Sequence, residues 1–177
     1  MADEFGQQMV ALLPNLRRFA ISLCRSRDIA DDLVQTTCEK ALANHSSYKP
    51  GTRMDAWLFR ILRNSWIDRV RRNRTEGHAV EIDDANALIG QDGQTVTEAR
   101  LTLDETAKSI AALPDDQREV LLLVCVESLS YREASEVLDV PIGTVMSRLA
   151  RARKKISEDM GIDAEVKRSN DKEGFRT

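Results

Sequence analysis

Residues 130–156 constrain the fold of this chain more than any other stretch. Two short helical patterns lie on either side of the break Asp139-Val140-Pro141. The sequence Ser130-x-x-Glu133 is a capping box, which predicts the start of the first helix. Apolar residues continue at helical spacing on both sides of the break, namely Ala134, Val137, Leu138, Val145, Leu149, Ala152 and Ile156. The stretch therefore predicts two helices joined by a tight turn, each with one buried face.

The second of these helices carries a dense group of cations outside its apolar face. Five bases and no acid fall between Arg148 and Ile156. Two helices joined by a short turn, the second of them basic, form the helix-turn-helix arrangement that enters the major groove of DNA. Two amphipathic helices of a bundle with a solvated basic surface would show the same periodicity. The coincidence of cap, break and basic face favours the DNA-binding interpretation.

Charge is segregated along the chain, although the net charge is only −3. Residues 51–75 hold seven Arg against two Asp, whereas residues 76–119 hold eleven acids against three bases. Two basic segments separated by an acidic one indicate two nucleic-acid contacts, held apart by a segment that DNA repels. One basic block alone is usually a solvated face, but two blocks on predicted helices favour DNA as a partner.

Composition and periodicity predict an all-α chain made of two small helical domains. Only 5% of the residues are aromatic, and there are eight Gly and four Pro, whereas residues that favour helices abound. Pro14 predicts a bend or a break in the first helix, and Asp28 is the predicted N-cap of the second. The predicted helices span residues 4–24, 28–43, 54–72, 96–112 and 114–127, followed by the helix-turn-helix.

The polar, glycine-containing stretch 75–96 predicts a flexible acidic linker. It separates a domain at 1–74 from a second domain at 97–157, and the polar residues 158–177 predict a frayed tail. This organisation leaves the relative placement of the two domains open.

The residue types that metal, cofactor or enzyme chemistry requires are not grouped in this sequence. Cys24, Cys38 and Cys125 stand alone in apolar helical runs and are interpreted as core residues in a reducing compartment. His45 and His78 have no neighbouring ligand types, so no metal site is predicted. Since no nucleophile–base pair and no phosphate-binding loop is evident, we expect no enzyme, no cofactor and no small-molecule substrate.

The sequence shows no signal for membrane insertion or secretion. The N-terminus lacks a basic flank followed by an apolar run, and no stretch approaches the roughly 18 apolar residues of a membrane span. A cytoplasmic protein is therefore expected.

Four motifs resemble the extracytoplasmic-function (ECF) sigma factors of RNA polymerase. The stretches 31–37 (DDLVQTT) and 55–64 (DAWLFRILRN) resemble their region 2. The stretches 113–123 (LPDDQREVLLL) and 143–153 (GTVMSRLARAR) resemble their region 4. The resemblance extends from about residue 12 to residue 156, with the motifs in the family's order. It implies a protein that binds core RNA polymerase and directs promoter-specific transcription initiation.

The resemblance implies that the N-terminal domain recognises and melts the minus-10 element. Tyr48 matches an aromatic position of the family, and Asn64 matches an Asn that contacts the non-template strand. The arginines that are candidates for phosphate contact are Arg60, Arg63, Arg69, Arg71, Arg72 and Arg74. As alternatives, the ring of Tyr48 packs across its loop and Asn64 caps or bridges helices. Trp57 and Trp66 are interpreted as core or half-buried residues.

In the C-terminal domain, the resemblance implies that the helix beginning near Ile142 reads the minus-35 element in the major groove. The residues expected to face base edges are Thr144, Ser147 and Arg148, and those expected near phosphates are Arg151 and Arg153. Met146 occupies a position that is often Arg or Lys in the family. An apolar contact, for example with a thymine methyl group, could replace a charged one there.

An acidic face on the second helix matches the family surface that docks on the polymerase clamp. Its residues are Asp28, Asp31, Asp32, Gln35 and Glu39. Acids on an exposed helix are common, so this assignment depends on the resemblance. The expected partners are core RNA polymerase, promoter DNA and an anti-sigma factor that clamps both domains. Stretches 13–19 and 31–35 further resemble the general-stress branch of the family.

Two other classes of function stay open on the sequence. An autonomous helix-turn-helix regulator would bind a duplex operator by itself, as a dimer on symmetric half-sites. A sigma mimic would titrate an anti-sigma factor without contacting DNA. Such mimics usually carry a receiver domain and lack cationic recognition surfaces, whereas this chain has no room for a receiver and keeps its Arg clusters.

Overall fold

The computed structural model describes residues 2–76 and 98–161, and all regular elements within these ranges are helical. The all-α prediction is therefore confirmed for the described part of the chain. Most of the predicted linker and most of the predicted tail lie outside the described residues. The N-terminal unit consists of α1 (Ala2–Cys24), α2 (Arg27–Ala43), the short 3-10 helix η1 (His45–Ser47) and α3 (Met54–Thr75). The C-terminal unit consists of α4 (Glu98–Ala111), α5 (Asp115–Leu121), the π-helical turn η3 (Leu122–Val126), α6 (Tyr131–Leu138) and α7 (Ile142–Asp159).

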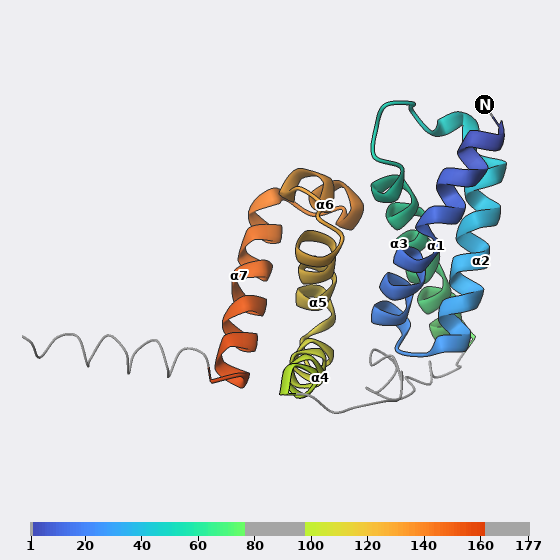
Figure 1. Cartoon of the computed structure of the whole chain (residues 1–177). Coiled ribbons are helices and arrows are strands. Elements are labelled where there is room, and N and C mark those ends of the chain that lie inside the picture. The colour runs from blue at the N-terminus through green and yellow to red at the C-terminus, as the bar shows by residue number, and fades with distance from the viewer. Residues whose placement is uncertain (1, 77–97, 162–177) are drawn as a thin grey trace, which may run out of the picture.

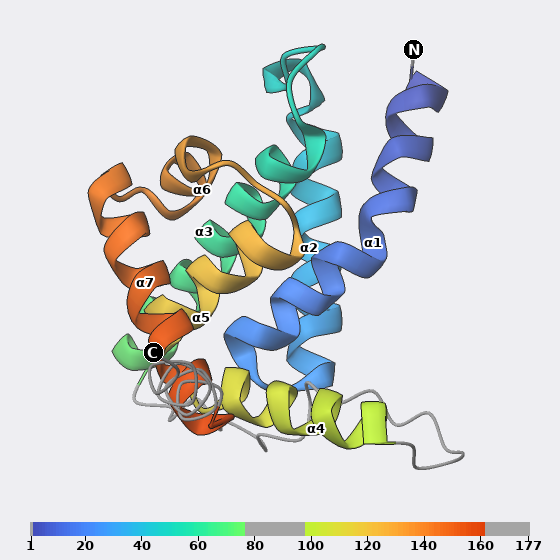
Figure 2. The same ribbon diagram turned by 60° about the vertical axis from the view of Figure 1, so that its left-hand side comes forward.

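The three long helices of the N-terminal unit pack against one another around an apolar core (Figure 1). Leu16 and Phe19 of α1 are buried against Leu58 and Phe59 of α3, and the two phenyl rings meet edge to face at 5.2 Å. Pro14 lies inside α1, which bends near its middle but is not divided (Figure 2). The bend is the expected effect of a residue that cannot donate a backbone hydrogen bond.

The N-terminus of α2 differs from the sequence prediction. Ser26, not Asp28, is the N-cap, and its hydroxyl accepts a hydrogen bond from the backbone N–H of Ile29. Asp28 lies in the first turn, where its charge favours the positive end of the helix dipole. Both residue types are common caps, and the helix begins one residue earlier than predicted because Ser26 takes the extended backbone that a cap needs.

The helix-turn-helix forms as the sequence predicts. The hydroxyl of Ser130 accepts from the N–H of Glu133, and the carboxylate of Glu133 accepts from the N–H of Ser130, which completes the capping box. Asp139 ends α6 in the left-handed region with φ of 53°. The predicted apolar residues of both helices are buried, except that Ile156 is partly buried.

The two units pack on each other in this structure. Contacts run between α1 and α5 and between α3 and α6, and one continuous apolar core joins both units. Figure 2 shows α5 crossing beside α1 and α3. Arg118 of α5 is 1% exposed, and its guanidinium donates to the carbonyl oxygens of Ser22 in α1 (2.9 Å) and Leu113 (2.8 Å). The relative placement that the sequence left open is thus a closed one.

The three cysteines differ in their exposure to solvent. Cys24 is buried and Cys38 half-buried, but Cys125 is exposed, so the prediction of a core role is wrong for Cys125. No helix among the described residues has the length and apolar character needed to cross a membrane.

Candidate nucleic-acid interface

The loop between η1 and α3 holds Tyr48 in an aromatic cluster. The ring of Tyr48 is half-buried and lies 5.4 Å from Trp57 and 5.9 Å from Phe5, centroid to centroid. Its hydroxyl donates to the carbonyl oxygen of Thr52 at 2.7 Å, which closes the loop. The structure therefore shows the packing across the loop that the sequence offered as the alternative for this residue. Trp57 and Trp66 are half-buried, as expected.

Three polar residues form a stripe along the exposed side of α3. Arg60, Asn64 and Arg71 follow one another at spacings of four and seven residues, which places them on one face of the helix. All three are exposed, and so is Arg72 on a neighbouring face. No acid among the described residues pairs with Arg60, Arg71 or Arg72, so these cations are available to a partner that lies along α3.

Two other arginines of α3 are already paired. Arg63 points toward the C-terminal unit, where its Nε lies 3.0 Å from the carboxylate of Glu119, and both side chains are about 15% exposed. Burial raises the pKa of Glu119, and the charge of Arg63 opposes that shift. Arg69 lies 3.6 Å from Asp32 of α2. In this arrangement Arg63 does not reach the surface on which Arg60 and Asn64 lie.

The outer surface of α7 combines polar, apolar and cationic side chains. Ser147 and Arg151 are exposed and face solvent, while Thr144 is half-buried. Arg148 lies against α5, with its Nε 3.0 Å from the carboxylate of Asp116, and its side chain is 23% exposed. Met146 is 52% exposed. The N-terminal turns of α7 therefore present hydroxyl, thioether and guanidinium groups side by side.

Arg153 lies on a flank of α7 rather than on its outer surface. Its Nη2 is 3.6 Å from the thiol of the exposed Cys125. The interaction with Cys125, together with a smaller one with Tyr131, raises the pKa of the guanidinium. The side chain therefore faces the corner between η3 and α6, away from Ser147.

Comparison with known proteins places the two basic helices, α3 and α7, in two regions of one protein family. Residues 9–76 match the family model of Sigma-70 region 2, and residues 103–156 match that of Sigma-70, region 4. The ECF RNA polymerase sigma factor EcfG of Rhodopseudomonas palustris (strain TIE-1) is 41% identical over 92% of this chain and 88% of that protein. The chain belongs to the ECF sigma factors. Members of this family bind core RNA polymerase and direct it to promoters.

Other sigma factors show the same likeness. The ECF sigma factor SigM of Bacillus subtilis (strain 168) is 31% identical over 87% of this chain and 91% of that protein. Among solved structures, the sigma factor RpoE in complex with the anti-sigma factor NepR from Bartonella quintana is 35% identical with a TM-score of 0.74. That likeness covers 90% of this chain and 98% of RpoE. CnrH in complex with the cytosolic domain of CnrY is 28% identical with a TM-score of 0.63, over 90% of this chain and 88% of CnrH.

The acidic face predicted on α2 of this sigma factor is exposed along its length. All five residues, Asp28, Asp31, Asp32, Gln35 and Glu39, are exposed. Asp31 accepts two hydrogen bonds from Arg17 at 2.6 and 3.0 Å, which lower the pKa of its carboxyl. Gln35 donates to Glu39 at 3.0 Å. Asp32 has a longer contact with Arg69, at 3.6 Å, and the hydrogen bond to Glu39 comes from a neutral amide, so both carboxylates present more of their charge to a partner than Asp31 does.

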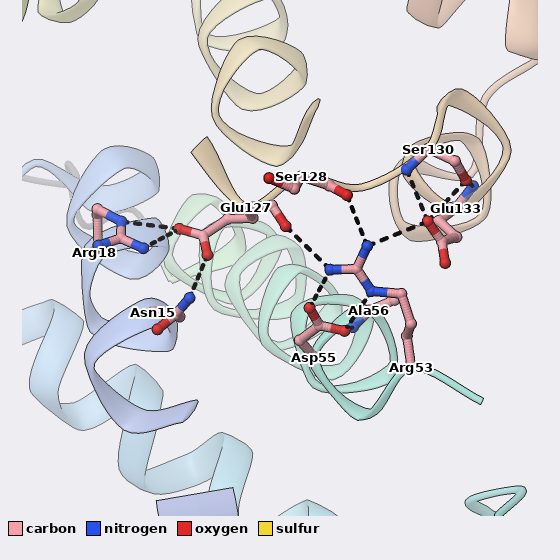
Figure 3. A network of polar contacts seen from close by, with 9 residues as sticks. All are labelled: Asn15, Arg18, Arg53, Asp55, Ala56, Glu127, Ser128, Ser130 and Glu133. Atoms are coloured by element: carbon pink, nitrogen blue, oxygen red, sulfur yellow. Dashed lines mark hydrogen bonds and ion pairs between the residues drawn. The ribbon is translucent and has the colours of Figure 1, made fainter. Parts of the chain in front are cut away.

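The sequence did not reveal a polar network at the boundary between the two units of the sigma factor (Figure 3). The guanidinium of Arg18 and the amide of Asn15, both on α1, donate to the carboxylate of Glu127, which is 2% exposed. Arg53 donates to the carbonyl oxygens of Ser128 (2.7 Å) and Glu127 (3.1 Å) and pairs with Asp55. The contacts with Glu127 and Ser128 join residues 74 or more positions apart, so no local pattern could have indicated them.

Proposed function

We propose that this sigma factor recognises the minus-10 element with its N-terminal unit and the minus-35 element with α7. On the N-terminal unit, the stripe Arg60–Asn64–Arg71 follows the phosphates and base edges of the melted strand, with Arg72 beside it. Tyr48 and its loop form the end of this surface. Base extrusion costs a few kcal/mol, which stacking and edge contacts must offset, and an ordered aromatic loop supplies such contacts at little entropic cost.

On the C-terminal unit, the N-terminal turns of α7 enter the major groove. Ser147 and Thr144 offer hydroxyl groups to base edges, and Met146 offers an apolar surface that suits a thymine methyl. Arg148 reads a base from its position beside Asp116, whereas Arg151 contacts phosphate. Arg153 is assigned to phosphate at the rim, after rotation away from Cys125.

The observation that carries this proposal is the coexistence of two exposed cationic helices in one chain of this family. Arg71 and Arg72 on α3 and Arg151 on α7 have no acidic partner among the described residues. Asp32 and Glu39 on α2 complete the set as the docking surface for core polymerase. The protein acts by binding rather than by catalysis, and it works in the cytoplasm where polymerase and chromosome are found.

An anti-sigma factor is the further partner that we propose. RpoE of Bartonella quintana, 35% identical to this chain, was solved with the anti-sigma factor NepR, and CnrH with the cytosolic domain of CnrY. A stress signal would then act by removing the antagonist. The likeness to RpoE and to EcfG supports the general-stress branch.

Run-off transcription with purified core polymerase tests the proposal. We expect promoter-specific transcripts from genomic promoter templates only when the chain is added. A variant in which Ala replaces Arg71 and Arg72 should fail to form the open complex. Permanganate reactivity of unpaired thymines detects that complex. A chain that gave no specific transcript at any salt concentration, yet bound a duplex operator as a dimer, would instead be an autonomous regulator.

A further inference from the structure

A groove runs between the loop before α3 and helix α6. Its volume is about 660 Å³, which lies in the range of small-molecule sites in proteins. The N-terminal unit lines it with Lys49, Trp57 and Arg60, and the C-terminal unit lines it with Arg132 and Val137. Of the side chains named above for contact with the melted strand, only Arg60 lines this groove. The groove is therefore a separate candidate site.

Bases outnumber acids in this groove, and each acid is already paired. Glu133 lies 3.6 Å from Arg53 (Figure 3). Glu136 lies 3.4 Å from Arg132. The other charged side chains that line the groove are Lys49 and Arg60, which are exposed and have no acidic partner among the described residues. Two cations in the groove are therefore available to an anion.

An indole ring lies in the same groove. Trp57 is half-buried, and its ring centroid lies 5.4 Å from that of Tyr48 and 6.2 Å from that of Phe5. These neighbours hold the indole in place, so a ligand that stacks on it immobilises little additional side chain. Aromatic side chains stack on nucleobases because every base has a flat π-face. A fixed indole beside two unpaired cations therefore suits a ligand that carries both a planar base and phosphates.

We propose that this groove binds a nucleoside diphosphate. Lys49 and Arg60 contact its phosphates from one side of the groove, and Arg132 contacts them from the other. The base stacks on Trp57. A standard protein–protein interface takes about 20–30 residues on each side, more than line this groove, so a small ligand fits it better than a docked protein. A bound nucleotide also takes Arg60 from promoter phosphates. That consequence rests on the proposed function, whereas the binding itself does not.

Quenching of tryptophan fluorescence measures this binding. The chain has two Trp, and only Trp57 lines the groove. Trp66→Phe leaves Trp57 as the single indole, and titration of this full-length variant with GDP or ADP should quench its emission to saturation. Trp57→Phe is the matched variant, because it keeps a ring in the aromatic cluster and leaves Trp66 as the reporter. Its emission should stay constant over the same titration.

Charge reversal in the Trp66→Phe chain tests the two sides of the groove separately. Lys49→Glu on the loop and Arg132→Glu on α6 should each lower the affinity for GDP about tenfold or more, the usual effect of losing a hydrogen bond to a charged group. Lys108→Glu is the matched control, because Lys108 is exposed on α4, does not line the groove and undergoes the same change of charge. Screening by salt should limit its effect to about twofold.

Absence of saturable quenching by both GDP and ADP would overturn the proposal. So would an Arg132→Glu variant that behaved like Lys108→Glu, because the site would then not span the groove. Asn64→Ala should leave the affinity for GDP unchanged, and a loss equal to that of Lys49→Glu would place the nucleotide on the strand surface instead. Nucleotide binding as expected, without promoter-specific transcripts, would count against the proposed function alone.

Discussion

Arg148 of α7 lies against Asp116 of α5, with 3.0 Å between its Nε and the carboxylate Oδ2. The pair fixes the guanidinium at the edge of the proposed major-groove surface and reduces the rotamer freedom that DNA binding would otherwise remove. A base that accepts a hydrogen bond from Arg148 must therefore compete with the carboxylate of Asp116 for the guanidinium, or share the guanidinium with that carboxylate. If Arg148 reads a base as proposed, its removal should affect the reading of one position more than overall affinity.

Replacing Arg148 with Ala should lower transcription mainly through loss of minus-35 recognition. One bidentate contact with a base contributes about 1–3 kcal/mol of discrimination, so the loss on a cognate promoter should be about tenfold or more. Run-off transcription from templates with cognate and substituted minus-35 elements measures the effect. Lys155→Ala is the control, because Lys155 pairs with Asp159 near the end of the helix. Equal losses of Arg148→Ala on both templates would assign the residue to phosphate instead.

Replacing Asp32 and Glu39 with Lys should weaken binding to core polymerase. Both carboxylates are exposed, and charge reversal of rim residues chiefly slows association and changes its salt dependence. Asp32 pairs with Arg69 at 3.6 Å, but an exposed pair of this kind contributes only about 0–1 kcal/mol to stability. The far-UV circular dichroism spectrum should thus stay unchanged while co-purification with core decreases. Undiminished co-purification would argue against α2 as the docking surface.

Replacing Arg118 with Ala should destabilise the chain strongly. The guanidinium is 1% exposed and donates to the carbonyl oxygens of Ser22 and Leu113 and to the carboxylate of Asp115. Loss of the guanidinium leaves buried carbonyl acceptors without a partner, which typically costs about 1–3 kcal/mol for each such group. Urea unfolding followed by circular dichroism measures the change. Arg132→Ala, which removes an exposed arginine paired only with Glu136, should cost about 0.5 kcal/mol or less.

The stability of the chain should depend on pH through Glu119. Burial raises the pKa of this carboxyl above its ordinary value of 4.5, so the folded chain holds the proton more tightly than the unfolded chain does. Its contribution to stability is fully present below pH 4.5 and is lost as the pH rises through the folded pKa. Glu119→Gln removes this dependence, whereas the exposed Glu105→Gln should keep it. Urea unfolding across this pH range compares the variants, and parallel curves for wild type and Glu119→Gln would contradict the expectation.

The sequence predicted the local structure well where a local cause exists. The capping box Ser130–Glu133 and the apolar spacing of 134–152 indicate α6 and α7, and the structure confirms both. The placement of Asp28 as a cap was wrong by two residues, because Ser26 offers an equally good side chain and has the required backbone conformation.

The parts that the sequence could not predict depend on contacts between distant segments. Arg63 looked like any other cation of α3, and only the tertiary structure shows that Glu119 covers it. Arg148 and Arg153 likewise looked equally available, whereas Asp116 and Cys125 hold them in different directions. Spacing along a helix identifies a face, but the neighbour of that face depends on the packing of the whole chain.

The aromatic cluster around Tyr48 bears on attempts to change the promoter preference of a sigma factor. Phe5, in the first turns of α1, lies 5.9 Å from the Tyr48 ring and 6.2 Å from that of Trp57, although more than 40 residues separate it from either along the chain. A loop transplanted into another sigma factor would therefore arrive without the ring that supports it from α1. Specificity engineering at this position should exchange the first turns of α1 together with the loop.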